Sequence, residues 1–219
     1  MLFRSSQFTI FGLDLADGVA GASSLPLPTT LNTTSVEIGG VPVPLQYVSP
    51  TQINGITAPN LGASANVELV VKKGSVRSAS TFYRLVSATP GLFTLDRTAG
   101  GPVNALHSAD FTQINSLRPA RRGEIVVLFA TGLGAVNVGL TPGAGAPENP
   151  IAMTVGTPVV MIGNVQVPVT FSGLSPRSVG LFQVNVQIGD NVPTGLSLPI
   201  VVTMGGQVSN TATIAVTTP

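Results

Sequence analysis

The sequence predicts an all-β chain that folds into two tandem β-sandwiches, and three observations support this. Glycine and proline supply 25 and 18 of the 219 residues and recur throughout, which disfavours long helices because both residues interrupt them. Short hydrophobic runs alternate apolar with polar positions at the period of two expected for half-buried strands. The two halves of the chain also carry matching strings in the same order, which indicates an internal duplication.

Strands are expected wherever this alternation occurs. It is clearest in residues 41–47, 165–171 and 182–188, where every second residue is apolar. Shorter hydrophobic runs predict further strands at 8–13, 67–71, 82–86, 125–130, 200–204 and 213–216.

Two residue pairs predict tight turns between strands. Gly39-Gly40 and Gly163-Asn164 each separate two β runs, and both pairs tolerate the positive φ of a two-residue hairpin turn. Prolines lie inside the runs that follow, at Pro42, Pro44 and Pro168. Because proline has no N–H for a ladder hydrogen bond, both runs are expected at sheet edges.

The internal duplication becomes visible when the two halves are aligned. The offset between matching strings grows from 118 to 124 to 131 residues, and growth in steps indicates loop insertions. Each copy is then a unit of roughly 90 to 100 residues with about seven short strands, the size of one sandwich. The matching strings are 10–16 with 128–134, 38–47 with 162–171, and 69–74 with 200–205.

One segment, 88–123, has no counterpart in the first copy. It contains several Gly and Pro residues that break regular structure, and its runs 103–106 and 111–114 are expected to form a small hairpin that closes the second sandwich. The domain boundary is therefore predicted near Ala88.

The composition predicts a nearly neutral surface. Charged residues make up 9% of the chain, against roughly a quarter in an average soluble domain, and the mean hydropathy is +0.45. These values exclude an intrinsically disordered chain. A net charge of +1 leaves no electrostatic footprint for nucleic acid or an anionic membrane, so neither is expected as a partner. Short basic clusters are expected at solvated strand ends or turns; they are Lys72 with Lys73, and Arg118 with Arg121 and Arg122.

Other broad features exclude further classes of protein. The chain has no cysteine, so disulfides and thiolate metal sites are excluded. No stretch approaches about 18 uninterrupted apolar residues, so no transmembrane helix is expected. Residues 1–24 lack the pattern of a signal peptide, so an export signal is expected to lie outside this chain or to have been removed.

No catalytic, cofactor-binding or metal-binding residue is predicted. His107 is the only histidine, no Gly-x-Ser-x-Gly elbow occurs, and Asp110 is expected to form a turn, so His107 is interpreted as a hairpin residue. Residues 125–134 end in Gly-Leu-Gly after a strand, as a dinucleotide-binding turn does. That interpretation fails because Asn137 stands where the motif requires Gly or Ala, and because three prolines preclude the helix that must follow. They are Pro142, Pro147 and Pro150.

Two features of the sequence could form part of a ligand site. Asp14 and Asp17 offer carboxylates beside a glycine-rich turn, but two are too few for calcium, and a structural turn is favoured. Sandwiches that bind glycans stack sugars on exposed aromatic side chains. Tryptophan is absent and only Tyr47 and Tyr83 are present, which weakens that hypothesis without excluding it.

Several strings in order give the chain its resemblance to a known family. Nearly the whole chain resembles the domain at the C-terminal end of many large secreted proteins of Solibacter and other acidobacteria. Each half is also similar to the IPT/TIG immunoglobulin-like domains of cell-surface receptors and bacterial adhesins. The strings that carry the first resemblance are 8–12, 25–31, 47–54, 90–94, 119–124, 130–134 and 180–186.

The resemblance implies two tandem immunoglobulin-like (IPT/TIG-like) β-sandwich domains, at 1–88 and at 89–219 with an extra N-terminal hairpin segment. It implies a secreted bacterial protein, extracellular or at the cell surface, with no catalytic residues to carry over. The family's domain usually ends a longer protein, so this chain is either a fragment or a complete working unit.

From these observations we expect a non-catalytic structural or adhesive module. A neutral surface with open sheet edges favours self-assembly into a filament, tube or layer, with copies of itself or other cell-surface proteins as partners. The alternative is a polysaccharide-binding or cell-wall-binding module, and no cofactor is expected.

Overall fold

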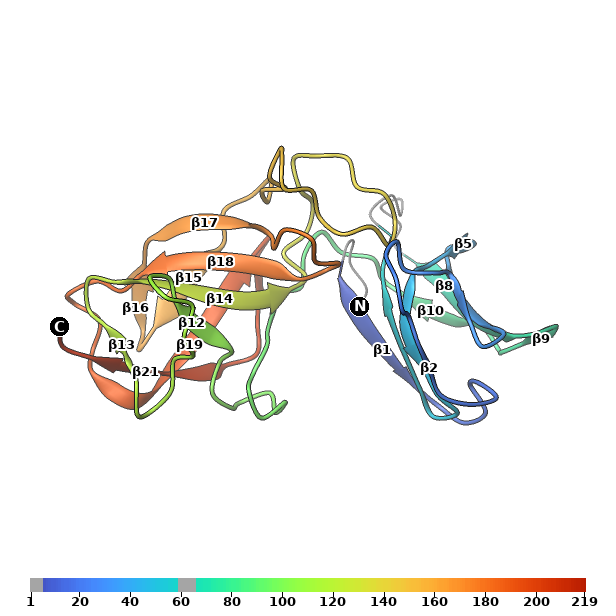
Figure 1. The fold of residues 1–219 in the computed structure, drawn as a ribbon, viewed down its shortest axis with the longest axis horizontal. Coiled ribbons are helices and arrows are strands. Elements are labelled where there is room, and N and C mark those ends of the chain that lie inside the picture. The colour runs from blue at the N-terminus through green and yellow to red at the C-terminus, as the bar shows by residue number, and fades with distance from the viewer. Residues whose placement is uncertain (1–5, 59–65) are drawn as a thin grey trace. The chain divides into compact units, whose positions relative to one another are not determined.

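The structure is a computed structural model that describes residues 6–58 and 66–219, and all regular secondary structure in these ranges is strand (Figure 1). The chain forms two tandem immunoglobulin-like β-sandwiches, so the predicted fold class is confirmed. Two compact units divide it: unit 1 is Met1–Ser87 with Asn137–Ala152 and Ser175–Gly180, and unit 2 is the remainder. The limits 1–88 and 89–219 stay a prediction, because unit 1 also takes in two segments from the second half.

Unit 1 contains two sheets, here called the β1 sheet and the β8 sheet. The β1 sheet has the order β1 (Gln7–Phe11), β7 (Gln52–Ile56), β6 (Leu45–Val48), β2 (Ala20–Gly21). The β8 sheet has the order β10 (Thr81–Tyr83), β8 (Val67–Lys73), β4 (Thr34–Ile38), β3 (Thr30–Leu31), with β5 (Val41–Pro42) beside β4 and β9 (Val76–Arg77) beside β8.

Unit 2 repeats this plan in the β14 sheet and the β19 sheet. The β14 sheet has the order β11 (Gly91–Leu92), β14 (Ile125–Thr131), β18 (Phe182–Gln187), β17 (Val169–Leu174), with β12 (Ala105–His107) also on β14. The β19 sheet has the order β13 (Ala120–Arg121), β21 (Ala212–Thr217), β19 (Gly195–Met204), β15 (Val159–Ile162), β16 (Val165–Val167), with β20 (Gln207–Val208) beside β19.

The cores of both units consist of the alternate apolar residues that the sequence pattern indicates. In unit 1 the buried residues Val36, Ile38, Leu45 and Ile53 come from both sheets and belong to one cluster. In unit 2 the fully buried side chains again come from both sheets; they include Leu128, Val160, Ile162, Phe182, Val184 and Ile200.

Strand register shows that the two units are copies of one fold. Ile38 lies opposite Leu69, and at the matching place Ile162 lies opposite Ile200. These are the residues that the sequence alignment puts in step.

An irregularity in the ladder is duplicated as well. The register shifts just before Tyr47, which then pairs with Asn54. The same shift precedes Phe171, which pairs with Asn185. Both asparagines accept a hydrogen bond through Oδ1 from a glutamine two residues earlier, at 2.8 and 2.9 Å.

Both predicted turns are confirmed, because Gly39 and Gly40 have φ of 60° and 77°, and Gly163 and Asn164 have φ of 55° and 66°. The prediction of one continuous strand after each turn is wrong. Residues 41–47 divide into β5 and β6, which lie in different sheets, and 165–171 divide in the same way into β16 and β17.

Proline explains where each run divides. Pro44 and Pro168 stand at the crossing between sheets, where neither needs to donate to a ladder. Their carbonyl groups still accept hydrogen bonds, from Ile56 N at 2.9 Å and from Gln187 N at 3.0 Å. The edge prediction holds for β5, β16 and β17, but it is wrong for β6, which lies between β7 and β2.

Candidate functional site

The outer edge of β14 in unit 2 is covered by strands from the segment 88–123, here called the covering segment. β11 and β12 both pair antiparallel with β14. The N–H of Phe129 donates to Asn104 O at 3.3 Å, and the carbonyl oxygen of Phe129 accepts from Phe93 N at 3.1 Å. The backbone groups that point away from β18 are therefore bonded at this residue.

The covering segment also closes the other sheet of unit 2. The N–H of Thr213 on β21 donates to Gly101 O at 3.0 Å, and its carbonyl oxygen accepts from Val103 N at 2.8 Å. Further along, β13 pairs parallel with β21 at Val216 and Thr217. One segment thus closes edges of both sheets of the second sandwich.

The side chain of Asn210 fastens the covering segment. Its Oδ1 accepts from Leu92 N at 2.8 Å, and its Nδ2 donates to Leu92 O at 3.2 Å and to Ala99 O at 2.8 Å. Ser209 before it accepts from Val202 N at 3.0 Å, as Ser78 accepts from Val71 N at 3.1 Å in unit 1. The residue of unit 1 equivalent to Asn210 is therefore Ala79, which has no polar side chain.

Unit 1 leaves the equivalent edges open. Phe11 lies opposite Gln52 as Phe129 lies opposite Gln183, and Phe82 lies opposite Glu68 as Thr213 lies opposite Pro199. Within the described residues, β1 pairs only with β7 and β10 pairs only with β8.

The backbone groups at these edges point outward. Ser6 O and Gly12 N bond toward β7, so the alternate residues Thr9 and Phe11 present their N–H and C=O groups to the other side. Within the described ranges, no hydrogen bond reaches those groups or the backbone groups of Phe82.

Core-facing side chains on β1 are less buried than their equivalents on β14, as expected if the edge of β1 is open and the edge of β14 is covered. Phe8 and Ile10, which face the core of unit 1, are only partly buried. Their equivalents Val126 and Leu128, which lie opposite His107 and Ala105 of β12, are 0% exposed. Phe11 and Phe82 are 76% and 64% exposed. Both edges therefore present an aromatic side chain to water, at Phe11 and Phe82, whose outward backbone groups have no partner among the described residues.

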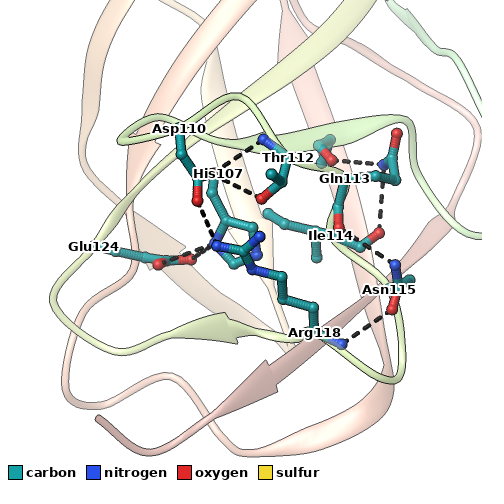
Figure 2. A network of polar contacts seen from close by, with 9 residues as sticks. His107, Asp110, Thr112, Gln113, Ile114, Asn115, Arg118 and Glu124 are labelled. Carbon is teal, nitrogen blue, oxygen red and sulfur yellow. Dashed lines mark hydrogen bonds and ion pairs between the residues drawn. The ribbon is translucent and has the colours of Figure 1, made fainter.

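The loop that follows β12 is held by a polar network that Figure 2 shows. His107 is buried, and its Nδ1 lies 3.0 and 3.2 Å from the two carboxylate oxygens of Glu124. Asp110 accepts from the backbone N and the Oγ1 of Thr112, at 3.0 and 2.7 Å, and pairs with Arg118. The Thr112 hydrogen bonds, followed by Arg118, lower the pKa of Asp110 to about 2.

These contacts bear on the histidine prediction. Leu106 bridges Gln113, so His107 lies in a hairpin, and Asp110 forms a turn with Thr112. The partner of His107 is Glu124, which sequence reasoning gave no role. Nδ1 of the histidine and the carboxylates of both acids hold structural partners, while Nε2 of His107 is buried with no hydrogen-bond partner among the described residues.

A pocket of about 430 Å³ lies beside this network. Its lining carries two arginines and two acids, so these charges largely balance. Arg118 pairs with Asp110, and the other two are Arg121 and Glu124. The pocket therefore shows no strong preference for a ligand of one charge.

The carboxylates considered for calcium are occupied by a lysine. Nζ of Lys73 lies 2.5 Å from Asp14 Oδ1 and 3.4 Å from Asp17 Oδ1. The hydrogen bond that Lys73 donates to Asp14 is the main cause that raises the pKa of Lys73. No group of three metal-binding side chains occurs within residues 6–58 and 66–219. Ion pairs with Lys73 therefore engage both carboxylates, and the interpretation of this segment as a structural turn stays a prediction.

The other sequence candidates also have structural contacts. Tyr47 and Tyr83 are half-buried, and Tyr83 packs against the core of unit 1, so neither is a free platform for a sugar ring. Arg122 donates to Val192 O at 2.8 Å and Lys72 pairs with Glu37 at 2.5 Å. In the described chain, no helix follows β14.

No family model and no curated protein matches the chain. Among solved structures it is similar to the I9–I11 tandem of titin, at 12% identity and a TM-score of 0.28, covering all of this chain and 62% of that one. It is also similar to domains 5–6 of the S-layer protein SbsC, at 12% identity and a TM-score of 0.27, covering 98% of this chain and 91% of that one. The tandem Ig repeats of Dlar share 15% identity over 97% of this chain and 98% of that one, with a TM-score of 0.19.

At such TM-scores these likenesses add nothing to the fold assignment, which rests on the sheets themselves. In the described part of the chain, no helix has the length and apolar character needed to cross a membrane.

Proposed function

We propose that this chain is a non-catalytic, extracellular structural or adhesive module that associates through the open sheet edges of unit 1. One observation carries the proposal: the covering segment covers one edge of each sheet of unit 2, and within the described residues the equivalent edges of unit 1, β1 and β10, are open. A partner strand that adds to an open edge completes hydrogen bonds that water otherwise satisfies.

The composition supports association over repulsion. Only 9% of residues are charged and the net charge is +1, so copies of the chain repel one another weakly. β1 has the sequence QFTIF and carries no lysine, glutamate or proline, the residues that usually protect an exposed edge. The resemblance to the acidobacterial secreted domain supports a place outside the cell.

The proposal is tested by the association state of the purified full chain. Light scattering coupled to size-exclusion chromatography, followed by negative-stain microscopy, should show dimers or larger assemblies whose proportion rises with concentration. A chain that remains a monodisperse monomer at high concentration contradicts the proposal and favours a passive spacer.

Polysaccharide binding is the second candidate. The exposed aromatic rings of Phe11, Phe82 and Phe111 are better placed to stack on a sugar than the half-buried rings of Tyr47 and Tyr83. A glycan array that gives specific binding, lost in Phe82→Ala, would establish it. The absence of binding leaves the structural role ahead. Hydrolysis of any glycan that is abolished by His107→Ala would overturn the non-catalytic assignment.

A further inference from the structure

We infer that β1 is a homodimerisation strand, which pairs antiparallel with β1 of a second copy, with Thr9 opposite Phe11 and a two-fold axis at Ile10. This rests on the proposed function and deepens it, because it names one edge, one partner and one register. The second unit of the chain, the strand's own backbone and its lack of charge support it independently.

Unit 2 shows what covers this edge when the covering is built into the chain. Phe129, the equivalent of Phe11, exchanges backbone hydrogen bonds with extended residues of β14's outer neighbours, and both of those strands run antiparallel to it. The same fold therefore accepts an antiparallel strand at this position. In unit 1 the described residues supply none.

The outward backbone groups of β1 match a second copy of themselves. Thr9 and Phe11 each present an N–H and a C=O on the open side. In an antiparallel pair, Thr9 N–H donates to the carbonyl of Phe11 in the second copy, and Phe11 N–H of that copy donates back to the carbonyl of Thr9. The two-fold axis repeats this exchange on its other side, so every outward group of both residues is bonded.

The side chains fit the same arrangement. Ile10 and Phe8 face the core and are only partly buried while the edge is open. At the axis, Ile10 contacts Ile10 of the second copy. This contact would bury Ile10 as its equivalent in unit 2, Leu128, is buried. Phe11, 76% exposed, lies on the opposite face beside Thr9 of the second copy. Apolar area is thus removed from water on both faces.

Charge does not oppose the pairing. β1 itself carries no ionisable side chain, and the carboxylate of Asp14 beyond it is already paired with Lys73. The edge β10 is a weaker candidate, because Phe82 is its one residue with outward backbone groups. The charged residue Arg84 also comes directly after the end of this strand.

The test compares association constants of full-length variants by sedimentation equilibrium. Thr9→Pro removes the outward N–H at a position where an edge strand tolerates proline. Thr9→Lys adds a positive charge, and two-fold pairing brings it close to the same lysine of the second copy. Both should weaken dimerisation about tenfold or more, since each change acts twice per dimer. The matched control is Thr81→Lys on β10, which should associate as the wild type does.

A second measurement reports on the register. The chain has no cysteine, so Ile10→Cys introduces a single thiol at the proposed axis, in a non-hydrogen-bonded pair whose Cα separation suits a disulfide. Dissolved oxygen should convert this variant to a covalent dimer, and should form no covalent dimer of a Val76→Cys variant, which places its thiol on the exposed strand β9.

The outcomes separate this inference from the proposed function. A wild-type chain that never associates contradicts both the β1 pairing and the proposed function. Association that persists unchanged in both Thr9 variants, or that is lost in Thr81→Lys, overturns the β1 pairing and leaves the broader proposal standing. Equal disulfide formation by Ile10→Cys and Val76→Cys contradicts the register.

Discussion

Truncation of one matched core residue in each unit tests whether the covering segment protects the second sandwich. Leu128 lies on β14, which pairs with β12 of the covering segment, and is 0% exposed, whereas its equivalent Ile10 lies on the open strand β1 and is partly exposed. Leu128→Ala leaves a closed cavity. Ile10→Ala leaves a recess at an edge that water can reach.

The two losses of stability should differ in magnitude. Removal of a fully buried Leu side chain costs about 3 kcal/mol, the sum of lost transfer energy and a cavity. For Ile10 part of the side chain is already hydrated and the recess refills with water, so about 1 to 2 kcal/mol is expected. Val36→Ala and Val160→Ala are the matched controls, because both valines are 0% exposed at equivalent positions and should lose similar amounts.

The chain itself supplies the probes for this assay. Tyr47 and Tyr83 are the only tyrosines and both lie in unit 1, so tyrosine fluorescence follows unit 1 while far-ultraviolet circular dichroism follows both units. Urea unfolding at low protein concentration should shift the dichroism transition of Leu128→Ala by about 1 to 2 M, with the fluorescence transition unchanged. Ile10→Ala should shift the fluorescence transition by less. Equal shifts for the two variants would refute the role given to the covering segment.

Three further predictions concern the polar contacts. Asn210→Ala removes the hydrogen bonds that fasten Leu92 and Ala99, so unit 2 should lose about 1 to 3 kcal/mol while unit 1 keeps its fluorescence transition; an unchanged unit 2 contradicts that fastening. Because the folded state lowers the pKa of Asp110 from 3.8 to about 2, its stabilisation is complete above pH 4 and is lost as the pH falls toward 2; Asp110→Asn should flatten this part of the pH profile of unit 2, and a profile identical to wild type argues against it. Millimolar calcium should leave the Tm of the wild type unchanged because Lys73 occupies the carboxylates, and Lys73→Met should lower the Tm only slightly because the ion pair is exposed, whereas a calcium-dependent rise in Tm would restore the calcium site.

The duplication could be predicted because its marks are local. Residues 38–47 and 162–171 keep glycine, proline and apolar residues in step, and turns depend on just those residues. The division of each run between two sheets could not be predicted from periodicity. Side chains continue to alternate when the backbone leaves one sheet and enters the facing one, so Val41 and Leu45 give no sign that they belong to different sheets.

The covering of unit 2 depends on pairings between distant residues, which composition and period do not record. The runs 103–106 and 125–130 are both visible as strands, but only the fold places His107 beside Val126 and brings Glu124 within reach of its ring. One signal was present in the sequence: Asn210 stands where the first copy has Ala79, and a polar residue at a duplicated position indicates a contact that the other copy lacks.

Residue-resolved hydrogen exchange of the dilute, monomeric chain tests the central claim most directly. The amides of Phe129 and Thr213, which donate to Asn104 O and Gly101 O, should be protected, while those of Phe11 and Phe82 should exchange at rates near those of an unfolded peptide. Equal protection of Phe11 and Phe129, or rapid exchange at all four amides, would contradict the account of one fold with a closed copy and an open one.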